Sequence, residues 1–228
     1  MRTAERDTLL VVLAITSGAA DAWSYVGLGH AFVANMTGNT VLLGISVFNP
    51  EHDFLHPLIA LACYATGVAC GSFLTRRVRP GHIWSRSTSK VLLVEFLMLA
   101  GAELAWLAVG GTPSALLRCV ILACVAIGIG LQSGALLPLK LPGIITTYIT
   151  GTWTTLISGL ALMLGSRERL PPNKENFEER LLIQIVFIGI YFLSAVTTVF
   201  VFQYRPTMTG AIPATPILLV AIYGLLRG

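Results

Sequence analysis

Long apolar stretches alternate with short polar ones along this chain. A helix rises about 1.5 Å per residue, so it needs about 20 apolar residues to cross a hydrocarbon core about 30 Å thick. Six stretches meet this requirement and are predicted to span a membrane: Thr8–Leu28, His56–Leu74, Val91–Val109, Ala115–Leu137, Leu182–Phe202 and Ile212–Leu226. We therefore predict an all-α fold, a polytopic helical membrane protein.

Two further apolar stretches, Phe32–Phe48 and Gly143–Leu164, are interrupted by similar Thr-Gly motifs. Polar groups inside a membrane segment are costly, so two interruptions at matching places indicate a binding site near the midplane. If both stretches are broken or re-entrant, the chain has six spans, both termini inside, and two halves of opposite orientation. If both cross fully, it has eight spans, both termini outside, and two halves of the same orientation.

The charged loops favour six spans. Thr75–Lys90 carries five basic residues and no acidic one, whereas Asn49–His56 carries two acidic residues and no Lys or Arg. The positive-inside rule therefore places the first loop in the cytoplasm and the second outside. Four basic residues in Ser166–Arg180 place that loop inside, as six spans require. This asymmetry accounts for the net charge of +4 without a nucleic-acid partner.

The order of elements predicts two related halves within one membrane domain, 1–112 and 113–228. Aligning Thr37-Gly38 with Thr150-Gly151 also brings Gly18–Asp21 near Gly130–Ser133. The later spans of each half then pair as well, His56–Leu74 with Leu182–Phe202 and Val91–Val109 with the terminal span. Identity between the halves is weak, so chance similarity of apolar segments is the alternative.

The run GAADAWSYVGLGHAFVANMTGNTVLLG, at 18–44, and the run GLQSGALLPLKLPGIITTYITGTWTTL, at 130–156, resemble the signature of the YoaK-like family of membrane proteins. That resemblance covers nearly the whole chain and implies about six spans. The family is classed as a domain of unknown function, so the resemblance implies no substrate, reaction or functional residue.

Both motifs offer a glycine that permits a helix break, flanked by side chains that cap freed backbone groups. Exposed helix N-termini would favour an anion and exposed C-termini a cation, and the sequence leaves open which end faces the site. The alternative is that these polar groups only hydrogen-bond between helices. The candidate substrate-binding residues are Asp21, Asn35, Thr37, Gly38, Asn39, Thr40, Gln132, Thr147, Thr150, Gly151 and Thr152.

Three acidic residues lie within predicted spans: Asp21, Glu95 and Glu103. A carboxyl group there is expected to be protonated, paired or turned toward a wet cavity. We treat all three as candidates for proton coupling. For Asp21, a structural ion pair with Arg118 is the alternative.

The predicted function is transport of a small solute or ion, with proton coupling as an option. The alternative is a non-transporting assembly or regulatory protein, in which the motifs only pack helices. We expect no enzyme, because the sequence lacks a phosphate-cradling loop, a metal-ligand cluster and a nucleophile elbow. No cofactor or metal is expected, and the four cysteines are expected to pack in the spans. The expected location is the cell membrane, and a homo-oligomer stays open.

Overall fold

The computed structural model describes residues 3–49, 51–78, 84–139, 149–164 and 174–227, and every regular element in these ranges is helical. Two 3₁₀ turns accompany the α-helices. The α-helices are α1 (Thr3–Gly27), α2 (Met36–Phe48), α3 (Leu55–Thr75), α4 (Arg86–Ala108), α5 (Ala115–Leu136), α6 (Ile149–Leu164), α7 (Lys174–Tyr204) and α8 (Ala211–Arg227).

Six of these helices are long and apolar enough to cross a membrane: α1, α3, α4, α5, α7 and α8. They coincide with the six predicted spans, which confirms the polytopic helical fold. The 13 residues of α2 reach only about 20 Å and the 16 described residues of α6 about 24 Å, less than a hydrocarbon core. The described helices therefore fit six spans and not eight.

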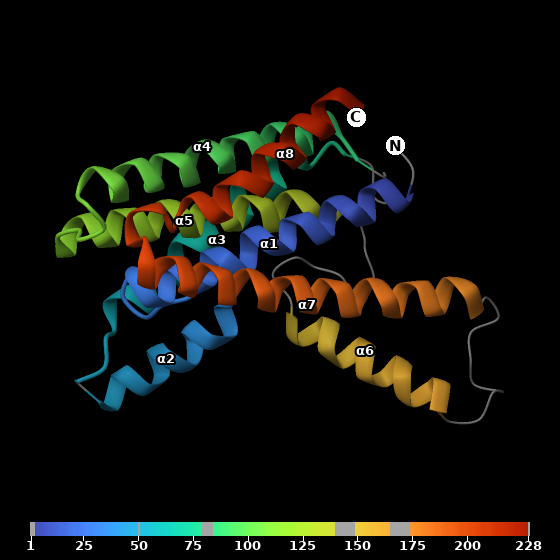
Figure 1. The fold of residues 1–228 in the computed structure, drawn as a ribbon, viewed down its shortest axis with the longest axis horizontal. Helices are drawn as coiled ribbons and strands as arrows, with labels where there is room; N and C mark the ends of the chain where they lie inside the picture. The colour runs from blue at the N-terminus through green and yellow to red at the C-terminus, as the bar shows by residue number, and fades with distance from the viewer. Residues whose placement is uncertain (1–2, 50, 79–83, 140–148, 165–173, 228) are drawn as a thin grey trace.

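The contacts between helices recur when each of α1 to α4 is replaced by the helix four positions later, and the reverse. α1 packs against α7 as α5 packs against α3, and α1 lies on α8 as α5 lies on α4. The short helices follow the same rule, because α2 contacts α3 and α6 contacts α7. α1 and α5 run in opposite directions in Figure 1, as they must when three spans separate their starts.

The pattern of buried positions is also the same in the corresponding helices. From residue 9 to residue 21 of α1, each position is buried or half-buried as its counterpart in 121–133 of α5. The buried positions of α3 from Pro57 to Gly71 also coincide with those of α7 when Tyr64 is aligned with Tyr191. The pairs are Pro57 with Gln184, Ala60 with Phe187, Gly67 with Ser194 and Gly71 with Thr198.

Two glycines bring the paired helices into close contact. A Cβ atom on Gly18 of α1 would collide with the carbonyl oxygen of Tyr191, and one on Gly130 of α5 would collide with that of Tyr64. Gly67 of α3 packs on α5 at Gly130. Small residues allow such approach where van der Waals packing holds membrane helices together.

Gly130→Ala is expected to destabilise the protein by about 1 to 3 kcal/mol, because the added methyl group meets backbone atoms that cannot move aside. Gly189→Ala in α7 is the matched control, since a Cβ atom there meets nothing within 4 Å. The control should keep or slightly raise stability, by up to about 1 kcal/mol of helix propensity. The measurement is thermal unfolding of both variants in detergent, and equal melting curves for the two would contradict the close α3–α5 contact.

Candidate functional site

A pocket of about 300 Å³ lies between α2, α3, α6 and α7. Tyr64 and Tyr191 form part of its wall and lie near the middle of α3 and α7, so the pocket is at mid-depth in the bundle. The described residues that line it carry no charged side chain. They are Ala34, Asn35, Met36, Thr37, Tyr64, Ile149, Thr150 and Tyr191.

The N-terminal ends of the two short helices meet at this pocket. Met36 and Thr37 begin α2, and Ile149 and Thr150 are the first described residues of α6. From there the two helices diverge in Figure 1, one toward each end of the bundle. The N–H groups of Met36 and Gly38 already donate to Ala34 O and Asn35 Oδ1, so α2 presents mainly the positive end of its helix dipole to the pocket.

Asp21 holds the non-helical segment that leads into α2. Its Oδ1 accepts hydrogen bonds from the backbone N–H groups of Val33, Ala34 and Asn35 at 2.8, 2.6 and 3.3 Å. Its Oδ2 accepts a hydrogen bond from the hydroxyl group of Tyr191 in the pocket wall. The carboxyl group is buried, so these donors compensate its removal from water. These contacts, and not an ion pair with Arg118, are the partners that the structure gives Asp21.

Asn39 and Asn35 are occupied by the backbone around them. The Asn39 side chain accepts from Phe32 N at 2.8 Å and donates to Phe32 O at 2.5 Å, and it is fully buried. The Asn35 side chain caps α2 by accepting from Gly38 N at 3.1 Å. Asn39 is therefore a structural residue, whereas Asn35 both caps the helix and lines the pocket.

The other predicted ligands that the structure describes are absent from the pocket lining. Gly38 packs on the Phe32 ring, and the Thr40 hydroxyl group donates to Met36 O within its own helix. Gln132 is buried in α5, where its amide group is 3.4 Å from the Ser17 hydroxyl group. Gly151 is half-buried and Thr152 buried in the first turn of α6, and Thr147 lies outside the described residues.

Glu95 and Glu103 do not line the pocket. Glu95 is fully buried on α4 beside Gly128 of α5, and within the described part of the chain neither carboxyl oxygen has a hydrogen-bond partner. Glu103 faces the backbone of Gly210 and Ala211 where α8 begins. A carboxyl group at a helix N-terminus stabilises that end, which is a sufficient structural role for Glu103.

Tyr64 and Tyr191 are the site residues that sequence reasoning missed. They are the only tyrosines in their two predicted spans, and they lie at nearly the same place, the ninth residue of His56–Leu74 and the tenth of Leu182–Phe202. That correspondence was the available signal. With Thr37 matching Thr150 and Met36 matching Ile149, the pocket is lined by three such pairs.

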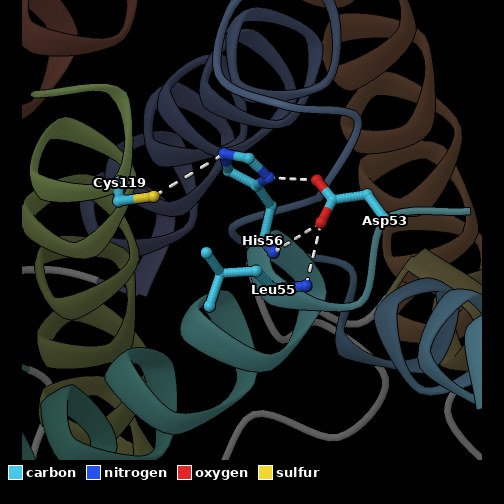
Figure 2. Close-up of polar contacts among 4 residues, drawn as sticks. All are labelled: Asp53, Leu55, His56 and Cys119. Atoms are coloured by element: carbon cyan, nitrogen blue, oxygen red, sulfur yellow. Dashed lines mark hydrogen bonds and ion pairs between the residues drawn. The ribbon is translucent and has the colours of Figure 1, made fainter. Parts of the chain in front are cut away.

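A second polar cluster joins α3 to α5 at one end of the bundle. Figure 2 shows the Asp53 carboxyl group paired with the His56 ring, whose Nε2 lies 3.7 Å from the Cys119 Sγ. Partial burial acts to raise the pKa of Asp53, but hydrogen bonds from the His56 ring and the Leu55 and His56 backbone outweigh it and lower the pKa from 3.8. Asp53 Oδ1 accepts hydrogen bonds from the backbone N–H groups of Leu55 and His56 at 2.8 and 3.4 Å, so the carboxyl group holds the first turn of α3.

Six spanning helices, with two short helices that meet at a polar pocket, define a polytopic membrane protein with a candidate solute site. The chain belongs to the family described as "Protein of unknown function (DUF1275)", whose model matches residues 9–223. It is 28% identical over 195 residues to the UPF0700 transmembrane protein YoaK of Bacillus subtilis (strain 168), covering 85% of this chain and 82% of the relative. The resemblance read from the motifs is thus confirmed. No solved structure matches the chain.

Asp21→Ala is expected to destabilise the fold by about 3 kcal/mol or more, because it leaves the buried N–H groups of Val33 and Ala34 and the part-buried one of Asn35 without an acceptor. Asp21→Asn keeps one acceptor oxygen and should lose clearly less. Thermal unfolding of the detergent-purified variants measures both losses. If the alanine variant melts with the wild type, Asp21 does not hold the segment before α2.

Proposed function

We propose that this protein carries a small solute or ion across the cell membrane, and that the pocket between α2, α3, α6 and α7 is its binding site. The observation that carries the proposal is the paired lining. Thr37 and Tyr64 come from the first half of the chain, and Thr150 and Tyr191 are their counterparts in the second. The proposal treats the protein as a carrier and not as an enzyme.

A pocket between two oppositely oriented halves suits alternating access. In many transporters a site at the midplane lies between inverted repeats and is built from discontinuous helices, so that rocking one half opens it to either side. The matching burial of α1 with α5 and of α3 with α7 supports the proposal that the halves form such a repeat. Small residues at the α1–α7 and α3–α5 contacts, including Gly18 and Gly130, are compatible with sliding of these pairs.

The pocket favours a polar solute with an oxygen-rich or negatively charged group. The N-terminal turn of α2 and the first described turn of α6 face it, and the hydroxyl groups of Thr37 and Thr150 can donate or accept hydrogen bonds. The Tyr191 hydroxyl group, which donates to Asp21, can accept one. No charged side chain lines it among the described residues, so orientation would come from dipoles and hydroxyl groups.

Proton coupling, if present, belongs to Asp21 in this proposal. The Tyr191 hydroxyl group lines the pocket and donates to Asp21, which gives a two-residue hydrogen-bonded path from solute to carboxyl group. Glu95 and Glu103 are absent from the pocket lining, and Glu103 faces the start of α8 instead. A solute that competes for the Tyr191 hydroxyl group would therefore alter the protonation of Asp21.

The alternative, a non-transporting assembly protein, draws support from one observation. Asp21, Asn35 and Asn39 all bond to the backbone that leads into or begins α2. These contacts alone would justify much of the first motif. They do not require the hydroxyl groups of Thr37 and Thr150 at the pocket, and this difference separates the two functions.

The test compares Thr37→Val and Thr150→Val with Thr66→Val, an exposed threonine of α3 whose hydroxyl group bonds only its own helix. Purified protein is screened by thermal stability against formate, acetate, phosphate, chloride, glycine, urea and glycerol, and compounds that bind are followed into proteoliposomes. We expect saturable binding and uptake that each pocket variant weakens about 5- to 10-fold, the value of one hydrogen bond, and that the control retains. Binding and uptake unchanged in the double pocket variant would contradict the site.

A further inference from the structure

A second pocket, of about 280 Å³, opens at the end of the bundle where α4 connects to α5. Its walls come from the end of α1 and the loop after it, the loop Gly111–Pro113, and the side chains of Trp106, Arg118 and Phe202. The indole N–H of Trp106 donates to Pro206 O at 2.7 Å, which fixes one wall. This pocket shares no lining residue with the pocket at mid-depth.

Arg118 brings an uncompensated positive charge to this pocket. Within the described part of the chain its guanidinium group makes no ion pair or hydrogen bond, and its Nε atom is fully covered. Arg118 is half-buried and its charge has no ion-pair partner among the described residues, so a bound anion would compensate it. The planar guanidinium group matches the two oxygens of a carboxylate or phosphate.

The corresponding arginine in the first half of the chain, Arg6, has an acidic partner. The alignment that pairs α1 with α5 sets Arg6 against Arg118 and Asp7 against Cys119. Arg6 donates to Asp7 at 2.8 Å. In α5 the acid is replaced by Cys119, which faces His56 instead (Figure 2).

The N-terminal end of α5 adds to the positive potential at this pocket. Arg118 lies in the second turn of α5, near the positive end of the helix dipole, and the first turn holds no acidic residue. The Asp53 carboxyl group, attached to the same end of α3, is occupied by His56. His30, at the pocket wall, is a further donor.

We propose that this pocket binds a small oxyanion, a carboxylate or phosphate group, through the guanidinium group of Arg118. The pocket lies at one end of the candidate span α5. The oxyanion can therefore come from a water-soluble solute or from the headgroup of an anionic lipid. The proposal is independent of transport, since it uses none of the residues of the pocket between α2 and α6. A solute bound here would occupy the end predicted to be external.

The test is a binding titration on full-length protein, with wild type, Arg118→Gln, Arg118→Lys and the control Arg205→Gln, which removes an exposed arginine at the same end of the bundle. Inorganic phosphate and acetate probe the soluble source in detergent, and dioctanoyl phosphatidylglycerol against dioctanoyl phosphatidylcholine probes the lipid source. Calorimetry measures affinity, and quenching of tryptophan fluorescence reports on Trp106 in the wall.

We expect saturable binding of at least one anionic probe, weakened about tenfold or more in Arg118→Gln, weakened less in Arg118→Lys and unchanged in Arg205→Gln. Preference for the anionic lipid over phosphate and acetate assigns the site to headgroups, and the reverse assigns it to solutes. The proposal is overturned if folded wild type binds no anionic probe, or if Arg118→Gln or, should that variant not fold, Arg118→Lys binds as tightly as wild type.

Discussion

The buried carboxyl group of Asp21 holds the backbone that leads to the mid-depth pocket of this protein. Non-helical backbone at that depth exposes N–H groups that lipid cannot satisfy. Asp21 accepts three of them, from Val33 to Asn35, and Asn39 closes the same segment by bonding both backbone groups of Phe32. Because of these contacts α2 can begin at mid-depth, with its N-terminus turned toward Tyr191. Without them the unpaired N–H groups would make non-helical backbone at this depth costly.

The packing of α1–α4 recurs in α5–α8 and brings the first described turn of α6 to the same pocket as the first turn of α2. Three spans in each half reverse the direction of the second, so α6 approaches the pocket from the side opposite to α2 (Figure 1). Gly18 on the carbonyl group of Tyr191 and Gly130 on that of Tyr64 set the two contacts at equal depth. The pocket therefore receives matching residues from both halves, while Arg118 and its counterpart Arg6 lie at opposite ends of the bundle.

Hydropathy was sufficient for the spans, because crossing a membrane needs length and apolar composition and little else. Polar residues within apolar stretches also identified Asn35, Thr37 and Thr150, which line the pocket, because polar groups are costly at membrane depth. Hydropathy misassigned the polar atoms of Asn39, because a motif does not reveal whether an amide group turns to the backbone or to a cavity. Tyr64 and Tyr191 were not predicted, because a tyrosine in a span is common and only the packing of the helices places these two at the pocket.

The most direct test of this account asks whether the N-terminal ends of α2 and α6 meet. In a protein whose four cysteines are replaced by alanine, Thr37→Cys and Thr150→Cys are combined with a protease site in the loop between Val109 and Ser114, and treated in membranes with a short bifunctional thiol reagent. The account predicts that the two halves stay joined after cleavage, whereas a control with Phe48→Cys and Met163→Cys at the far ends separates. Separation of the Thr37 and Thr150 pair in folded protein would contradict the shared pocket.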